Sequence, residues 1–107
     1  MKTYTPNGWA LMKSGIFIGL FASWDGDFTT GGNWRLSSDV EAVKEDNEYY
    51  YFYTHSGSCY TCSKNSNRVS VHNSLIFARL IYREGEDTYV VDEDKMHELF
   101  YITGDNK

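Results

Sequence analysis

Short apolar runs, separated by glycines, make up the first two thirds of the chain. "GWALM" and "IFIGLFASW" are rich in apolar, β-branched and aromatic residues, and "KSG" lies between them. Two strands of a hairpin have this pattern. The dipeptides Asp25-Gly26, Gly31-Gly32 and Ser56-Gly57 predict further turns. We therefore expect five or six short strands in sequence, arranged as an antiparallel β-meander or a small barrel-like sheet.

The hydrophobic pattern changes over residues 74–83. In "NSLIFARLIYREG", one face at i, i+4 spacing carries Ile76, Phe77, Leu80 and Ile81, and Gly85 follows. This spacing predicts a helix that ends at a glycine cap. A strand over the same residues fits nearly as well, and both interpretations remain open.

A second helix is predicted near the C-terminus, after the short strand "TYVV". Asp92 is a suitable N-cap, and we expect the helix to run to Tyr101 and to stop at Gly104. Its inner side would carry Met96, Leu99 and Phe100. The expected fold class is α+β: an antiparallel sheet with one or two C-terminal helices, in a single domain over residues 1–107.

Negative charge is concentrated in the last quarter of the chain. The net charge is −5, and residues 84–107 hold eight of the fifteen acidic residues but two of the ten basic ones. Binding of nucleic acid through its phosphates requires clustered Lys and Arg, so we expect no direct nucleic-acid binding. A protein partner with a basic surface suits this distribution of charge better.

The apolar runs are all shorter than the roughly 18 to 20 residues that cross a membrane. The start of the chain, "MKTYTPNGW", has no long apolar core like that of a secretory signal. We therefore expect a cytoplasmic chain that does not enter a membrane and whose thiols are reduced.

Both cysteines lie in "SGSCYTCSK", at the spacing of half a zinc site or a redox dithiol. In a strand, Cys59 and Cys62 point to opposite faces and cannot hold one metal ion together. His55 and His72 are the further ligands available, but their spacing does not match familiar zinc sites. We expect no metal or cofactor, with one cysteine in the core and the other partly exposed. The alternative is a small metal-binding protein or enzyme that uses these four residues.

The candidate catalytic bases are His55, His72 and His97. No sequence pattern places a nucleophile beside any of them, and "TTGGNW" lacks the lysine of a phosphate-binding loop. We therefore assign no catalytic residues and expect a protein that is not an enzyme.

The segment "YYYFYTH" predicts a strand that is aromatic on both faces. Tyr49, Tyr51 and Tyr53 share one face, and Tyr50 and Phe52 share the other. One face must belong to the core. For the other face we consider three uses, in order of preference: a second packing layer, a protein interface, or stacking on single-stranded bases.

Two acidic clusters flank "TYVV" and form the candidate partner surface, together with Tyr49, Tyr51 and Tyr53. The acidic residues are Glu84, Glu86, Asp87, Asp92, Glu93 and Asp94. A short strand between the clusters would bring both to one end of the domain, where they would imitate phosphates in a basic groove. Helix capping and solvation are the simpler use of the same carboxylates.

Two stretches, "FASWDGDFTTGGNWRLSS" and "EDNEYYYFYTHSGSCYTCSK", resemble stretches of small uncharacterised proteins of phages and prophages. The resemblance covers roughly residues 3 to 64, consists of turn glycines and aromatic residues, and carries over no activity or site residues. It implies a setting, that of small acidic phage proteins that inhibit host enzymes or CRISPR defence complexes stoichiometrically.

Three functions follow from these observations. The first is an inhibitor that occupies a basic groove of a host or CRISPR-type complex that handles nucleic acid. The second is a small metal protein or enzyme at the cysteines. The third is a structural or assembly protein that acts as a homodimer through its edge strands and tyrosines.

Overall fold

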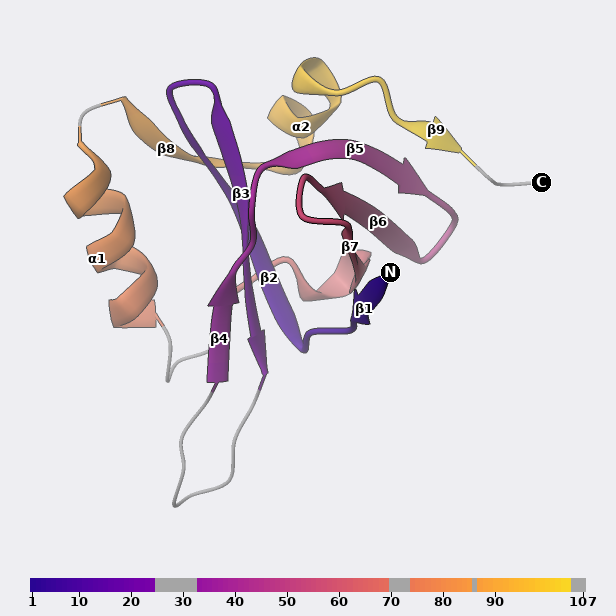
Figure 1. Cartoon of the computed structure of the whole chain (residues 1–107), viewed down its shortest axis with the longest axis horizontal. Coiled ribbons are helices and arrows are strands. Elements are labelled where there is room, and N and C mark those ends of the chain that lie inside the picture. Colours follow the sequence, from indigo (N-terminus) through magenta and orange to yellow (C-terminus); the bar gives the residue numbers. More distant parts are fainter. Residues whose placement is uncertain (25–32, 70–73, 86, 105–107) are drawn as a thin grey trace.

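Two β-sheets share one hydrophobic core, and two helices pack beside them (Figure 1). The computed structural model describes residues 1–24, 33–69, 74–85 and 87–104. The five-stranded sheet has the order β1-β7-β6-β5-β9, and the four-stranded sheet has the order β4-β3-β2-β8. The strands are β1 (Lys2–Tyr4), β2 (Gly8–Ser14), β3 (Phe17–Trp24), β4 (Asn33–Leu36), β5 (Val40–Glu45), β6 (Tyr49–Thr54), β7 (Ser58–Ser63), β8 (Thr88–Val91) and β9 (Thr103–Gly104). The helices are η1 (Lys64–Ser66, a 3-10 helix), α1 (Ser74–Glu84) and α2 (Glu93–Leu99).

Strand order confirms the α+β fold with antiparallel meanders. Strands β2, β3 and β4 pair antiparallel in sequence order, and so do β5, β6 and β7. Two further pairings are parallel, β1 with β7 and β5 with β9. The described part of the chain forms two sheets that do not close, so the barrel-like alternative is wrong.

Alternation along the strands puts one face of each sheet into the core. Tyr50 pairs with Cys62 and Phe52 pairs with Tyr60, so these four side chains share the inner face of the five-stranded sheet. Trp9 enters from the four-stranded sheet and is 1% exposed. The core further contains Leu11, Ile18, Leu20, Ala22, Val40, Val43, Val91 and Met96.

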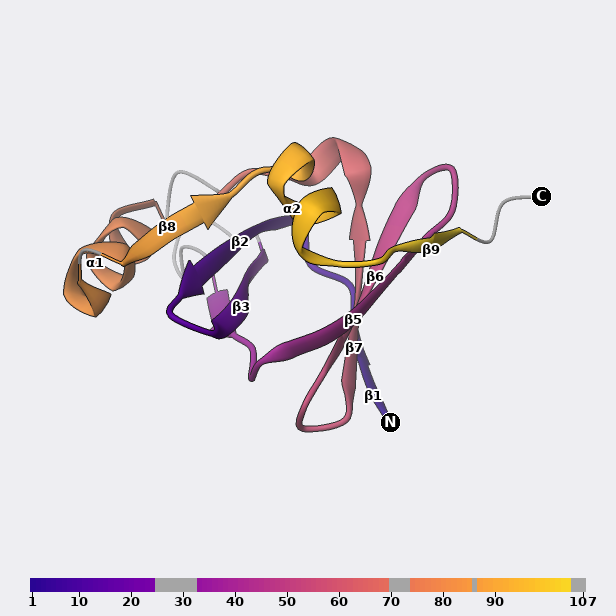
Figure 2. The same cartoon turned by 90° about the horizontal axis from the view of Figure 1, so that it is seen from above.

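Residues 74–84 form a helix, which settles the choice left open by the sequence. Gly85, with φ of 105°, follows its last residue, as the capping pattern predicts. The helix lies beside the four-stranded sheet at one side of the molecule, whereas β9 lies at the other side (Figure 2). Phe77 contacts Phe21 of β3, with 4.9 Å between ring centroids. The predicted turn at Ser56-Gly57 is present, and Asp25-Gly26 and Gly31-Gly32 lie outside the described residues.

Helix α2 begins as predicted and ends earlier than predicted. The Asp92 side chain accepts a hydrogen bond from the Lys95 amide at 2.8 Å, which makes Asp92 the N-cap. The helix ends at Leu99 instead of Tyr101, because Phe100 and Ile102 turn towards the core and pack against it. Gly104 consequently belongs to β9 and is not a helix stop. Among the described residues, no helix is long and apolar enough to cross a membrane.

We expect Met96→Ala to lower the free energy of unfolding by about 2–5 kcal/mol, because the Met96 side chain of α2 is fully buried in the core that both sheets share. Leu75→Ala on α1 is the matched control, since Leu75 is 61% exposed and its loss should cost less than about 0.5 kcal/mol. Urea denaturation measures both values. Equal losses in the two variants would contradict the placement of α2.

Candidate functional site

Two of the six acidic residues predicted to form one surface have structural roles. Asp92 caps α2, and Glu93 accepts a hydrogen bond from the Tyr50 hydroxyl at 2.7 Å. Asp87 and Asp94 are exposed. Glu84 is the last residue of α1, and Glu86 lies outside the described residues. Strand β8 has four residues, so it separates the two clusters by about 13 Å, at about 3.3 Å per residue.

Tyr49, Tyr51 and Tyr53 lie on the outer face of the five-stranded sheet and are half-buried, whereas Tyr50 is buried. The Tyr51 hydroxyl donates to Asp46 at 2.6 Å, and this bond, with two backbone amides, lowers the pKa of Asp46. Burial, and then the bond to Glu93, raise the pKa of Tyr50. The outer tyrosines therefore pack along their own sheet, and a role for them in an interface stays a prediction.

The strand register places Cys59 and Cys62 on opposite faces, as the sequence predicts. Cys59 is opposite Tyr53, and Cys62 is opposite Tyr50. Both are free and buried, so the expectation that one is partly exposed is wrong. The reason is that β1 pairs alongside β7 and places Thr3 next to Cys59. Burial raises the pKa of the Cys62 thiol, which disfavours the reactive thiolate.

The two histidines proposed as further metal ligands do not form a site with these thiols in the described part of the chain. His55 pairs with Glu41 at 2.8 Å, and His72 lies outside the described residues. Across the described part of the chain, no three metal-ligating side chains gather in one place. The His97 ring contacts the Glu93 carbonyl oxygen at 2.8 Å and the Glu45 carboxylate at 3.9 Å. Both described histidines therefore have structural partners.

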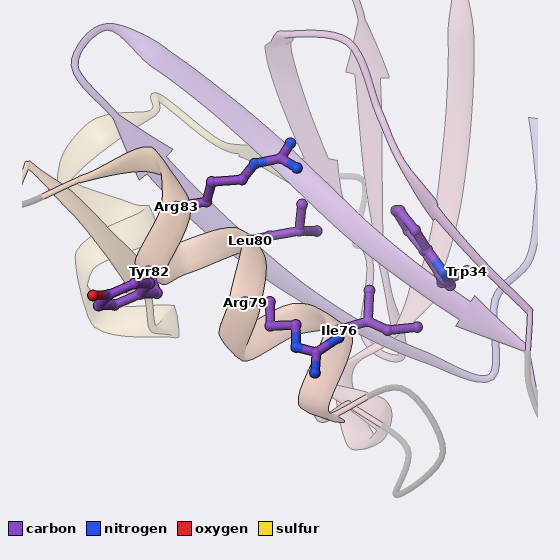
Figure 3. Close-up of a pocket in the computed structure, with 6 residues that line it drawn as sticks. All are labelled: Trp34, Ile76, Arg79, Leu80, Tyr82 and Arg83. Atoms are coloured by element: carbon purple, nitrogen blue, oxygen red, sulfur yellow. The ribbon is translucent and has the colours of Figure 1, made fainter.

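A groove lies between α1 and the four-stranded sheet, and the sequence analysis did not identify it. Its volume is about 460 Å³. We call it the Trp34 groove. Six residues line it: Trp34, Ile76, Arg79, Leu80, Tyr82 and Arg83. Figure 3 shows Ile76 and Leu80 extending from α1 towards Trp34 on β4. The groove is thus apolar inside and carries two guanidinium groups from one helix.

The position of Trp34 follows from the strand register. Trp34 is opposite Ser23, and Leu36 is opposite Phe21, so these residues share the outer face of the four-stranded sheet. The Trp34 indole stacks on the buried Phe21 ring, with centroids 5.4 Å apart and 16° between the planes. Phe77 of α1 also packs against Phe21, yet Trp34 remains 41% exposed.

The arrangement of α1 explains the charge at the groove. Arg79 and Arg83 are four residues apart, so they lie one turn apart on the same side of the helix, next to the row of Ile76 and Leu80. The ion pairs found among the described residues include neither arginine. A signal was present in the sequence, because "SLIFARLIYR" contains two arginines at i, i+4 spacing and no acidic residue.

Comparisons with known proteins add no relative: no protein-family model, curated protein or solved structure matches the chain.

We expect the pKa of His55 to lie above 6.5, because the hydrogen bond and then the charge of Glu41 favour the imidazolium form. The pair stabilises the fold while the His55 ring is protonated and Glu41 is ionised, and this contribution is lost as the pH rises through the raised pKa of His55. Titration of the ring protons by NMR measures the value, and Glu41→Gln should return it towards that of free histidine. An unchanged pKa in Glu41→Gln would contradict the pairing.

The thiols give a second prediction. Iodoacetamide at pH 8 should modify both cysteines slowly in the native protein, with Cys62 the slower, and quickly in the denatured protein, because both thiols are buried. Mass spectrometry after timed quenching measures the two rates. Rapid labelling of the native protein, or one bound zinc per chain in protein prepared without added metal, would show that this region adopts a different structure.

Proposed function

We propose that the chain is a stoichiometric binding protein that contacts a protein partner through the Trp34 groove. The observation that supports this proposal is the half-exposed Trp34 beside two arginines that pair with no described carboxylate. Trp and Arg are the residues most enriched among those that dominate binding energy at protein interfaces. The groove volume of about 460 Å³ is also within the range of ligand sites, about 300–1,000 Å³.

The groove is better suited to binding than to catalysis. Its lining supplies an indole, a phenol, aliphatic side chains and guanidinium groups. Arginine remains protonated in proteins, so it offers fixed positive charge and hydrogen-bond donors but no base. Each guanidinium can donate two parallel hydrogen bonds to one carboxylate of the partner. These properties favour recognition of a surface over transfer of a proton or a group.

An acidic second surface at β8 is the other candidate, and one observation favours it. Strand β8 is at the edge of the four-stranded sheet, and its Tyr89 and Val90 are 39% and 50% exposed. Asp87 precedes this strand, and Asp94 follows in α2. An exposed edge strand flanked by carboxylates is a suitable contact for a partner with a basic surface.

The resemblance to small phage proteins suggests where a partner should be sought. We propose that the partner is a host or CRISPR-type complex that handles nucleic acid. The chain would inhibit it by occupying a protein surface, without catalysing a reaction. The homodimer remains a distinct alternative, for which self-association is the readout.

Two charge-reversed variants of equal size separate the candidate surfaces. Arg79→Glu with Arg83→Glu should reduce capture of the partner from host lysate at least about tenfold, because it replaces both attractive charges by repulsive ones. Asp87→Lys with Asp94→Lys is the matched control and should leave capture nearly unchanged. It spares Asp92 and Glu93, whose carboxylates hold the cap and Tyr50. Quantitative mass spectrometry of the captured proteins provides the measurement.

The reverse pattern, with capture lost only in the Asp87 and Asp94 variant, would move the interface to β8. Capture of nothing by the folded chain, together with a dimer in sedimentation experiments, would replace the proposed function by self-assembly. Circular dichroism and urea denaturation of each variant confirm that it is folded before capture is compared.

A further inference from the structure

We infer that the Trp34 groove recognises an acidic amphipathic helix of its partner, with two carboxylates one turn apart beside an apolar side chain. This inference rests on the proposed function and specifies the chemistry of the partner. Its basis is the spacing of the two arginines, the apolar interior of the groove and the net negative charge of the chain.

The spacing of the positive charges sets the spacing of the negative ones. Residues four apart on a helix have Cβ atoms about 5–6 Å apart, so the side chains of Arg79 and Arg83 leave α1 one turn apart on the same side of the helix. Glutamates at i and i+4 of a second helix have the same separation. Two helices that pack with nearly parallel axes therefore bring each carboxylate opposite one arginine.

The free protein leaves this pair of charges without compensation from the carboxylates that the structure describes. Like charges at i, i+4 positions weaken a helix slightly, so an anionic partner relieves repulsion within α1 as well as adding attraction. In the part of the chain that the structure describes, the ion pairs involve Lys64, Lys95, His55 and His97. Neither arginine belongs to an ion pair among the described residues, which is the basis for assigning both to a partner.

The apolar part of the groove requires an apolar side chain from the partner. Ile76 and Leu80 form one wall and the Trp34 indole forms the other (Figure 3). Filling the space between them removes this surface from water and places the ion pairs at its rim, where a drier environment strengthens them. A helix with its apolar residues in a groove and its charges at the edge is a recurrent mode of peptide recognition.

A nucleic-acid strand fits these observations less well, although Trp34 offers a surface for base stacking. The chain has a net charge of −5, so a long polyanion meets repulsion outside the immediate neighbourhood of the two arginines. A short helix brings two carboxylates only, at the place where the positive charges lie. The observations therefore favour the acidic helix.

The test uses synthetic helical peptides and the full chain. The probe is an alanine-based peptide of about 18 residues, long enough to be partly helical alone, with two glutamates one turn apart beside a leucine and a phenylalanine. Isothermal titration calorimetry should show one peptide per chain. Replacing both glutamates by glutamine, or moving one so that they lie on opposite sides of the helix, should weaken binding at least about tenfold.

Charge exchange provides the decisive control. Arg79→Glu with Arg83→Glu should lose binding of the glutamate peptide and gain binding of a peptide with lysine at both positions, because the pairs are then restored with opposite sign. Arg79→Gln with Arg83→Gln removes the charges without reversal and should weaken the glutamate peptide alone. Asp87→Lys with Asp94→Lys, which are not among the six residues that line the groove, should retain binding of the glutamate peptide.

Three outcomes would overturn the inference: equal binding of the glutamate and glutamine peptides, tighter binding of oligothymidylate than of any peptide, or a chain that dimerises through the groove. The proposed function fails separately. If a partner captured through the groove binds equally well with and without its acidic helix, the inference is refuted, but the binding role remains. Peptide binding in a chain that captures no partner refutes the role and leaves the groove chemistry in place.

Discussion

The arrangement of the whole molecule depends on Trp9, which joins the two sheets. Its ring packs against Phe52 and Tyr50 of β6, at centroid distances of 5.2 and 5.8 Å, and its indole N–H donates to the Ser63 carbonyl of β7 at 2.7 Å. A bulky side chain with one directional bond fixes both the distance and the relative orientation of the sheets. Tyr50 continues the connection through its bond to Glu93 and holds the start of α2. Side chains alternate between the two faces of the four-stranded sheet, and Trp9 and Ala22 point into the core. Phe21 and Trp34 therefore lie on the outer face.

Local patterns in the sequence predicted those parts of the fold that local physics determines. Asp92 caps α2 and Gly85 follows α1 because each satisfies the end of its own helix. Cys59 and Cys62 lie on opposite faces because strand alternation requires it. The parallel pairings of β1 with β7 and of β5 with β9 join residues far apart in sequence, so no local signal specified them. The early end of α2 has the same origin, since Phe100 and Ile102 leave the helical path to reach a core that other segments build.

The candidate site was less predictable than the fold, because charge counting treats all carboxylates and all guanidinium groups alike. Of the acidic residues singled out, Asp92 and Glu93 are engaged in a cap and in a bond to Tyr50, and β8 separates the two clusters. The groove lies between β4 and α1, which begins about forty residues later in the chain. How open the groove is depends on how much of Phe21 and Trp34 α1 covers. The spacing of Arg79 and Arg83 was visible in the sequence, but its meaning required knowledge of which side of α1 faces the sheet.

The contrast between a negative protein and a positive groove has a physical consequence for selectivity. At physiological ionic strength the Debye length is about 8 Å, so an approaching ligand senses mainly the charges within that distance of its own. A ligand with two carboxylates at the groove rim is attracted by Arg79 and Arg83, whereas an extended polyanion also meets more of the fifteen acidic residues that give the chain its charge of −5. We therefore expect the two arginines to attract a short acidic segment more strongly than a nucleic-acid strand. A cationic pair on an acidic domain selects for the length of its ligand as well as for the sign of its charge.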